Sequence, residues 1–332
     1  MEPLAQKNAM YLSDTIIIVC FTLFYLTAYA TTTNKSINST TKVDVTMIPG
    51  ISGISRMSSN KYLIVHDAKV YEPDKPRLGL LNIKSTSGRI EYKRLDFPAA
   101  ASTPSNDLEG VCRVPNTSNE FLLAESGYWG KKYGRIFHIR VIEQRVVLVR
   151  EFQLPLLRDN NQDQRDGDQF EGIACIALNS ADILILLGER GGTTVYPMGI
   201  LRWGTYNLGT GRVAWSKQLL PVTAPNPWGV SRLRSITGLS IDSKGWLWGS
   251  AAVDPGNDGP FRSVVYLIGH VDGNQNIPVR LYNPDTYWIV DGFKVEGVVA
   301  GEDGLPLSIG TEDENFGGVW RPLPELNRKP PN

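Results

Sequence analysis

A short pattern that returns about every sixty residues is the feature that most constrains the fold of this chain. An apolar residue, then Glu, Ser or Thr, then glycine, then an aliphatic residue stand in this order five times. The glycines of the pattern are Gly53, Gly110, Gly172, Gly238 and Gly297, so successive units are 57, 62, 66 and 59 residues apart. A regular repeat of this length indicates structurally equivalent units, each of which must stack on its neighbours to bury its core.

Each glycine is followed by two kinds of segment. An apolar run ending in an acidic residue comes first, as in EFLLAE and DILILLGE, and this acid lies 14 to 17 residues after the glycine. Two segments of alternating polar and apolar residues follow, as in 134–154 and 262–282. Four short strands per unit, without helical periodicity, predict an all-β fold of the β-propeller type in which each unit forms one four-stranded blade.

Five units fill residues 42–325, and we therefore predict a single propeller domain with five blades. The last unit ends after residues 317–323, one strand short. The alternating segment KVDVTMI (42–48) is expected to supply that N-terminal strand and close the ring, which hides the open sheet edges. A sixth blade in a degenerate repeat is the alternative. The polar, proline-containing residues 326–332 are expected to form a disordered tail.

The first 30 residues have the composition of an export signal. Residues 15–30 form the only long apolar run, which is short for a membrane span and ends in the small-x-small cleavage pattern Ala-Tyr-Ala. The interpretation is a signal peptide over 1–30, a polar linker over 31–41 and a domain exported to the periplasm or the extracellular space. The alternative is an uncleaved leader that anchors the domain in a membrane.

The charge balance excludes one class of partner. Lys and Arg together number 34, and Asp and Glu also number 34, so no overall field attracts nucleic acid. We expect a monomer that acts on a small-molecule substrate or binds another protein, with membrane contact only through an uncleaved leader.

Two cysteines follow repeat glycines and remain after removal of the leader. In an exported protein, Cys112 and Cys175 could form a disulfide. The alternative is a pair of small buried hydrophobic residues. Cys112 comes two residues after its glycine and Cys175 three, and an offset of one residue places side chains on opposite faces of a strand. The sequence leaves both alternatives open.

The repeated glycine has a physical explanation in this fold. The innermost strands of a propeller crowd its axis, where a side chain is hard to accommodate. The residue before the glycine is Glu109, Glu171 or Glu296 in three of the units, and it is expected to face the axial channel or its mouth. The acids that end the second strands are expected to converge on the same face.

These glutamates are the leading catalytic and metal-binding candidates. Carboxylates from successive blades could hold Ca²⁺, which takes six to eight oxygen ligands, and the metal would polarise an ester or phosphoester and activate water. Glu312 and Asp313, in TEDENFGG, extend this ligand set. The alternative is that each Glu caps turn amides or pairs with Arg. Because like charges repel strongly at low dielectric, a converging cluster requires a cation or basic partners.

Further candidates are expected to line the same mouth. Arg190 suits an anionic group, and His66, beside Asp67, is the one histidine placed to act as a general base. Neither a Gly-x-Ser-x-Gly elbow nor a Ser-His-Asp pattern supports serine chemistry. The candidate ligand-binding residues are Asp67, Glu125, Glu189, Arg190 and Asn315.

At these segments the chain resembles the esterase-like phytase (phytase-like β-propeller) family and, more distantly, the SdiA-regulated periplasmic propellers. The matching segments span most of 51–318 and are ISGIS, YLIVHD, NDLEGV, FLLAES, QFEGIA, VEGVV and LSIGTEDENFGG. The resemblance implies an exported propeller with phosphoester or ester hydrolase activity. Ser52 and Thr237 stand where the other repeats have Glu, and basic residues to hold several phosphates are not clustered, which argues against phytate as the substrate.

We therefore predict a Ca²⁺-dependent hydrolase that acts on phosphoesters or esters at the propeller mouth. The alternatives are a non-catalytic propeller that binds a ligand or protein, and a sugar-lactone hydrolase on the same scaffold. An enzyme would bring the three repeat glutamates and the 312–315 loop to one mouth. A binding module would scatter them and expose an aromatic patch around Trp129, Trp228, Trp246 and Trp248.

Overall fold

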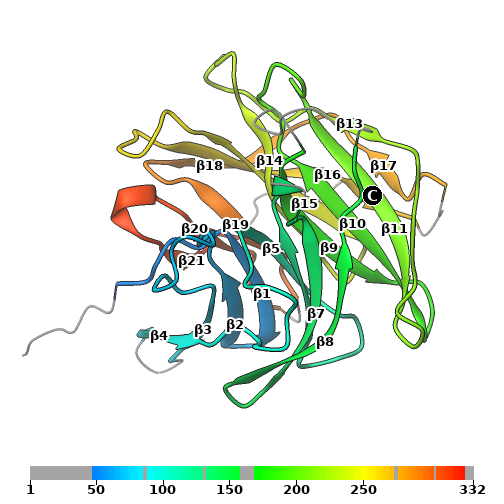
Figure 1. The fold of residues 1–332 in the computed structure, drawn as a ribbon. Coiled ribbons are helices and arrows are strands. Elements are labelled where there is room, and N and C mark those ends of the chain that lie inside the picture. Colours follow the sequence, from blue (N-terminus) through cyan, green and yellow to red (C-terminus); the bar gives the residue numbers. More distant parts are fainter. Residues whose placement is uncertain are drawn as a thin grey trace, which may run out of the picture. The chain divides into compact units, whose positions relative to one another are not determined.

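Each sequence repeat forms one antiparallel sheet, and the five sheets surround a common axis as the blades of a five-bladed β-propeller (Figure 1). This computed structural model describes residues 47–84, 88–129, 132–157, 168–272, 276–302 and 304–325. The predicted signal peptide, the polar linker, most of the closing segment 42–48 and the tail 326–332 lie outside the described residues. No helix among the residues searched has both the length and the apolar character needed to cross a membrane.

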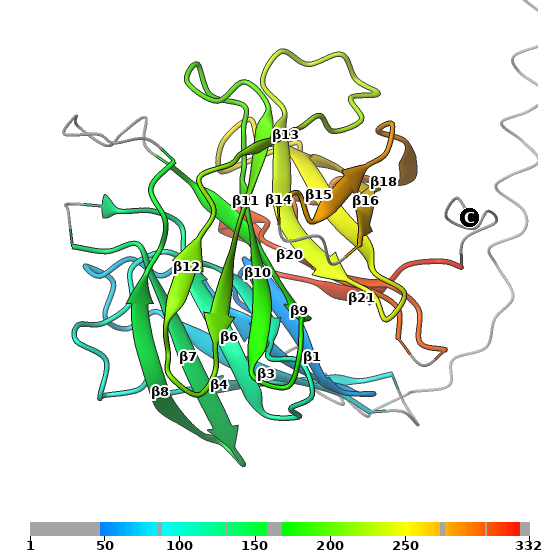
Figure 2. The ribbon, with the colours of Figure 1, turned by 90° about the vertical axis from the view of Figure 1, so that its right-hand side faces the viewer.

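The strands of a sheet follow the chain from the axis outward. The first sheet contains β1 (Gly53–Ser58), β2 (Lys61–Val65), β3 (Leu78–Ile83) and β4 (Ile90–Leu95). The second contains β5 (Leu108–Arg113), β6 (Glu120–Glu125), β7 (Arg135–Ile142) and β8 (Arg145–Gln153). The third contains β9 (Phe170–Ala177), β10 (Asp182–Glu189), β11 (Gly199–Asn207) and β12 (Val213–Trp215), with β13 (Leu220–Val222) also paired to β11 (Figure 2).

The last two sheets depart most from the simple pattern. The fourth contains β14 (Arg234–Ile241), β15 (Trp246–Val253), β16 (Arg262–Val271) and β17 (Val279–Leu281), with β18 (Thr286–Asp291) also paired to β16. The fifth has three strands, β19 (Val295–Val299), β20 (Ser308–Thr311) and β21 (Trp320–Pro322), and the short 3-10 helix η3 (Glu314–Phe316) lies between the last two.

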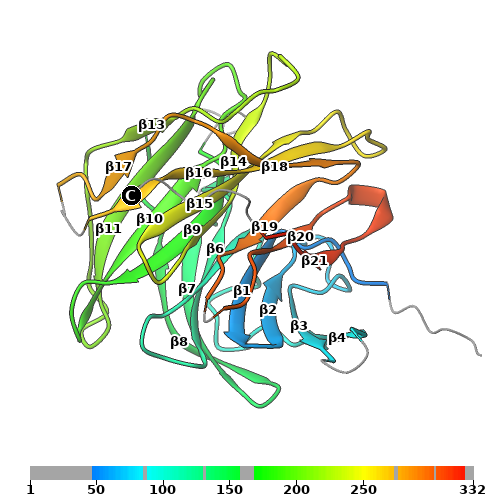
Figure 3. The same ribbon diagram turned by 180° about the vertical axis from the view of Figure 1, so that it is seen from behind.

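The start and the end of the domain meet at the fifth sheet. In the described part of the predicted closing strand, Ile48 forms an isolated antiparallel bridge with Gly318. Ile51 then donates its backbone N–H to the carbonyl of Thr311. Figure 3 shows β19, β20 and β21 beside β1 and β2. The ring therefore closes where the sequence predicted, although the described closing segment contributes a single bridge instead of a full fourth strand.

The apolar core is divided among the interfaces between sheets. Buried apolar side chains form five clusters, one between each pair of neighbouring sheets. Central strands are packed on both faces, so β10 is a continuous apolar run that is buried along nearly its whole length. The outer strand β4 has one face in solvent, and its residues accordingly alternate in burial.

The repeat glycines lie where neighbouring innermost strands approach most closely. A Cβ atom built on Gly238 would lie 2.4 Å from the backbone oxygen of Glu296 in the next sheet. A Cβ atom on Gly110 would lie 2.9 Å from a methyl group of Ile173, again in the next sheet. These contacts confirm that crowding around the axis, and not an unusual backbone conformation, selects glycine here.

A disulfide joins Cys112 of β5 to Cys175 of β9, with 5.7 Å between their Cα atoms. The argument that a one-residue offset separates the two side chains is wrong, because neighbouring innermost strands are themselves staggered by one residue. Gly110 lies against Ile173 and not against Gly172. Each cysteine lies two residues beyond this contact, so the two sulfurs are level, and the disulfide links the second blade to the third.

Candidate functional site at the acidic mouth

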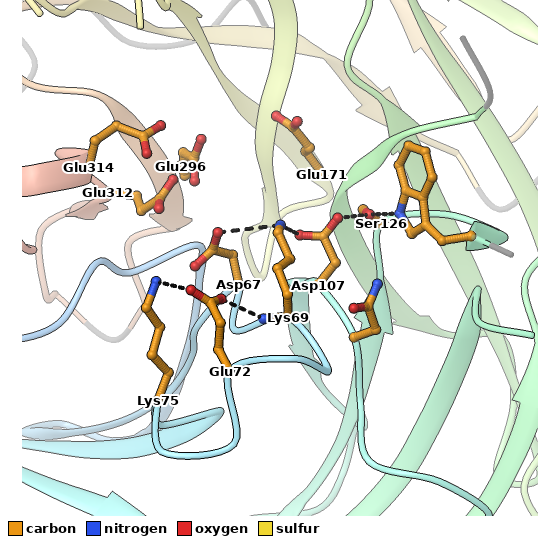
Figure 4. A network of polar contacts seen from close by, with 12 residues as sticks. Asp67, Lys69, Glu72, Lys75, Asp107, Ser126, Glu171, Glu296, Glu312 and Glu314 are labelled. Atoms are coloured by element: carbon orange, nitrogen blue, oxygen red, sulfur yellow. Dashed lines mark hydrogen bonds and ion pairs between the residues drawn. The ribbon is translucent and has the colours of Figure 1, made fainter. Parts of the chain in front are cut away.

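Three glutamates of the repeated pattern meet at one end of the axial channel. Glu109, Glu171 and Glu296 are each the second residue of an innermost strand, in β5, β9 and β19. Their charges interact with one another, and the three residues border a central cavity of about 10 Å³, which is room for about one water molecule. We call this end of the channel the acidic mouth. It comprises these glutamates and the charged residues that contact them, several of which are drawn in Figure 4.

The first carboxyl pair of the acidic mouth is Asp107 and Glu109. Asp107 forms an ion pair with Lys69 Nζ and accepts a hydrogen bond from Ser126 Oγ at 2.5 Å (Figure 4). It is also hydrogen-bonded to Glu109. Burial raises the pKa of Asp107, but the Lys69 ammonium and these hydrogen bonds outweigh burial and hold its pKa below the ordinary value. Burial, followed by the charge of Asp107, raises the pKa of Glu109 well above its ordinary value. The pair therefore favours one shared proton, held on Glu109.

The second carboxyl pair, Glu296 and Glu312, lies across the mouth and is arranged in the same way. Lys294 Nζ lies 3.0 Å from Glu296 Oε1 and 2.8 Å from Glu312 Oε2. Burial and then the charge of Glu312 raise the pKa of Glu296 well above its ordinary value. Burial also raises the pKa of Glu312, against the opposing charge of Lys294. Because the pKa of Glu296 is raised further, this pair favours its proton on Glu296, which is 3% exposed.

Glu171 differs from both pairs because its partners are guanidinium groups. Arg190 Nη1 lies 2.8 Å from Glu171 Oε1, and Arg234 Nη1 lies 3.6 Å from the same oxygen. Arg234 also contacts Asp254 at 2.6 Å. The other oxygen of Glu171, Oε2, is buried and accepts no hydrogen bond. Glu171 thus combines a charge held by two arginines with one unpartnered oxygen beside the central cavity.

Two acids predicted for ligand binding are instead buried in the blades. Both oxygens of Glu125 accept hydrogen bonds from Arg135, at 2.6 and 3.0 Å, so this carboxylate is fully occupied within its own sheet. Glu189 ends β10 and accepts the backbone N–H of Gly191 at 2.9 Å, while its other oxygen has no partner. Burial raises the pKa of Glu189 to about 8.

The remaining predicted residues divide between the mouth and its surroundings. Asp67 lies at the mouth, 3.4 Å from Lys69 Nζ. His66 is buried, with Nδ1 at 2.5 Å from the carbonyl oxygen of Gly50 and Nε2 at 3.2 Å from the Tyr92 hydroxyl, and burial lowers its pKa to about 4. With both ring nitrogens engaged, His66 is poorly suited to act as a general base.

The 312–315 loop is also divided. Glu312 turns into the acidic mouth, as described above. Asp313 is buried, where it accepts the backbone N–H of Lys294 and the Thr311 hydroxyl. Asn315 is exposed and donates a hydrogen bond to Asp258. In this loop, Glu312 and Glu314 both contact Lys294 Nζ, at 2.8 and 2.5 Å, whereas Asp313 and Asn315 have other side-chain partners.

Sequence reasoning missed the basic half of the site. The residues not predicted are the cations Lys69, Arg234 and Lys294 and the acid Asp107, whereas Asp254, an acid that ends a second strand, was expected on this face. A signal for two of them was present, since Asp107 precedes Glu109 by two residues and Lys294 precedes Glu296 by two. Side chains two apart on a strand share a face. Arg234 reaches Glu171 from the next blade, a contact that the spacing along the chain does not indicate.

These donors do not fit the predicted Ca²⁺ site. Ca²⁺ needs six to eight oxygens, most of them uncommitted, whereas Lys294 Nζ already lies within 3.0 Å of Glu296 and Glu312. The raised pKa of Glu109 and of Glu296 favours protonated carboxyl groups, which bind cations weakly. Among the described residues, no group of three or more His, Cys, Asp or Glu side chains is arranged to hold a metal ion. Instead, the chain's own lysines and arginines contact the converging acids and balance most of their charge.

Comparison with known proteins finds similarity in structure alone. Neither a family model nor a curated protein matches the chain. A thermostable family-43 glycoside hydrolase is 10% identical, with a TM-score of 0.48 over 86% of this chain and 96% of that one. A Cellvibrio cellulosa α-L-arabinanase mutant is 10% identical, with a TM-score of 0.44 over 82% of this chain and 90% of that one. A luciferin-regenerating enzyme is 10% identical, with a TM-score of 0.37 over 82% and 91%.

Proposed function

We propose that the protein is a hydrolase whose acidic mouth cleaves an uncharged ester, with lactones of sugars included in the substrate class. One observation carries this proposal. Around a cavity with room for about one water, Glu171 keeps an unpartnered oxygen while Glu109 and Glu296 have strongly raised pKa values. Carboxyl groups whose environments separate their pKa values are suited to the two roles of acid–base catalysis.

In the proposed reaction, Glu171 acts as the general base, and Glu109 and Glu296 act as hydrogen-bond donors and general acid. Glu171 Oε2 accepts a proton from the water, whose oxygen forms a bond to the ester carbonyl carbon. The protonated carboxyl groups of Glu109 and Glu296 donate hydrogen bonds to the developing oxyanion. One of them then gives its proton to the alkoxide as the carbon–oxygen bond breaks. Arg190 and Arg234 contact Glu171 Oε1 at 2.8 and 3.6 Å and orient the carboxyl group, so that its Oε2 is left for the water.

The charge of the mouth favours an uncharged substrate over a phosphoester. Four cations contact the site: Lys69, Arg190, Arg234 and Lys294. Among the described residues, the acids that they contact or approach are eight in number: Asp67, Asp107, Glu109, Glu171, Asp254, Glu296, Glu312 and Glu314. With Glu109 and Glu296 protonated, six negative charges face four positive ones, a net charge of −2. A phosphate dianion would gain no attraction there, which counts against the phosphoester part of the sequence prediction.

The aromatic residues do not favour the binding-module alternative. Trp248 is 4% exposed and packs in the core between the fourth and fifth sheets. Trp246 packs against His270 and Tyr282. Trp129 donates its indole N–H to Ser126. The exposed aromatic patch expected of a binding module is therefore not supported by these tryptophans, whereas the repeat glutamates do gather at one mouth.

The test is hydrolysis of p-nitrophenyl acetate, gluconolactone and p-nitrophenyl phosphate by the full chain. We expect turnover of the first two and none of the phosphate ester. Glu171→Gln should lower kcat by about 10²- to 10⁴-fold, which is the usual contribution of a general base. Glu91→Gln, on the outer strand β4, is the matched control and should keep full activity. An active Glu171→Gln variant, or a wild-type protein that cleaves neither ester, would refute the proposal.

A further inference from the structure

The opposite end of the axial channel holds a second and larger cavity. Its volume is about 590 Å³, within the range of small-molecule sites. The second halves of the innermost strands line it, so all five blades contribute to its wall. Between this cavity and the acidic mouth, apolar side chains close the channel, among them Val111, Ile173 and Leu239. The two sites are therefore separate.

The deep wall of this cavity is apolar. Ile54, Val111, Ile173 and Leu239 face it from four blades, and the Cys112–Cys175 disulfide forms part of the side wall. A polar molecule would leave its hydrogen-bonding groups unpaired against this surface, at a cost in free energy. The rest of the wall carries polar side chains, among them Ser55, Asn116 and Ser240, so the cavity suits a ligand with an apolar body against the deep wall and a polar end elsewhere.

One side chain of the wall lacks the partners that its charge requires. Arg56, the fourth residue of β1, is 6% exposed, and its Nε and Nη1 have no hydrogen-bond partner. Its Nη2 reaches the carbonyl oxygens of Ala300 and Pro306 at 3.4 and 3.5 Å, the outer limit of a hydrogen bond, and the guanidinium lies over the Tyr62 ring, 5.5 Å from the ring centre. No described carboxylate lies within ion-pair distance of the guanidinium, and burial of an uncompensated charge costs free energy.

The other charged residues of the cavity are already paired. Arg113 contacts Glu302 at 3.2 Å. Asp242 accepts the backbone N–H groups of Lys244 and Trp246 at 2.9 and 3.0 Å, and the Trp248 indole N–H at 3.3 Å. The two arginines and two acids of this wall balance in number, and Arg56 is the one whose side-chain nitrogens lack acceptors.

We propose that this cavity binds a small organic carboxylate with an apolar body, whose carboxylate pairs with Arg56. The apolar chain would cover Ile54, Val111 and Ile173, and the carboxylate would supply the acceptors that Arg56 lacks. A guanidinium suits a carboxylate because the two planar groups can form two parallel hydrogen bonds. This site is independent of the esterase activity proposed for the acidic mouth.

The test is isothermal titration calorimetry of the full chain at pH 7 with octanoate, and with 1-octanol as the uncharged probe of matched length. We expect octanoate to bind at least tenfold more tightly than 1-octanol. Arg56→Met, which keeps the length and removes the charge, should weaken octanoate binding at least tenfold. Arg140→Met is the matched control, since this arginine pairs with Glu120 on the outer part of the second blade, and it should bind octanoate as the wild type does.

A second variant separates binding from folding. Ala177→Trp keeps Arg56 and fills the cavity from its rim, where Ala177 ends β9, so it should also abolish octanoate binding. If Arg56→Met does not fold, loss of binding in Ala177→Trp together with preference for octanoate over 1-octanol supports the proposal. Equal affinity of Arg56→Met and wild type, equal affinity for the two probes, or no binding of millimolar octanoate overturns it.

Discussion

The buried carboxyl group of Glu189 makes the stability of this protein depend on pH in a predictable direction. Glu189 is fully buried at the end of β10, where one oxygen accepts the Gly191 N–H and the other has no partner. Burial, together with the charge of Glu171, raises its pKa from 4.5 to about 8. The folded protein therefore keeps a proton that the unfolded chain releases above pH 4.5. The contribution of Glu189 to the free energy of unfolding is therefore greatest below pH 4.5 and is lost as the pH rises towards 8.

The size of the effect follows from the shift. Each pKa unit corresponds to about 1.36 kcal/mol, so a rise from 4.5 to about 8 corresponds to about 5 kcal/mol of stability lost across this interval. Glu189→Gln replaces the carboxyl group by a neutral amide of the same shape and removes this ionisation. The variant should therefore gain stability relative to wild type, by up to about 5 kcal/mol between pH 4.5 and 8.

The assay is urea unfolding at pH 5, 6, 7, 8 and 9, followed by tryptophan fluorescence. The difference in unfolding free energy between Glu189→Gln and wild type should change steadily up to about pH 8 and then level off. Asp182→Asn, at the other end of β10, is the control, because a group with a lowered pKa does not titrate in this range. A difference that stays constant from pH 5 to pH 9 would refute the reasoning, since the pKa of Glu189 would then be the same in the folded and the unfolded protein.

Three further predictions concern the ring and its mouth. Reduction of the Cys112–Cys175 disulfide, which closes a separation of 63 residues, should cost about 4 kcal/mol in urea unfolding, and a cost below about 1 kcal/mol would contradict this. Gly238→Ala places a methyl group against the next blade and should destabilise by about 1–3 kcal/mol, whereas Gly209→Ala, which meets no atom closer than 3.5 Å, should change stability little. Addition of millimolar Ca²⁺ should leave the Tm equal to that measured in excess chelator, because Lys294 already contacts both Glu296 and Glu312; a clear rise in Tm would instead support a metal site.

Spacing along the chain was sufficient to predict the arrangement of the blades. The interval between repeat glycines indicated five units, and crowding at the axis explained why glycine is required in each. The place of Glu109, Glu171 and Glu296 in the same position of three innermost strands also predicted that they meet at one end of the channel. These inferences succeed because strand periodicity and repeat length are local properties of the sequence, and each of the five repeats shows them again.

Contacts between blades depend on a different quantity, the stagger of one strand against the next. That stagger brings Cys112 level with Cys175, and it brings Arg234 of the fourth blade to Glu171 of the third. It also leaves Arg56 without a carboxylate partner among the described residues of the second cavity's wall. The sequence alone therefore determined which residues the repeat carries to the axis. Only the tertiary structure decided which charges meet there, because ion pairing depends on distances of a few ångströms between strands that are far apart in the chain.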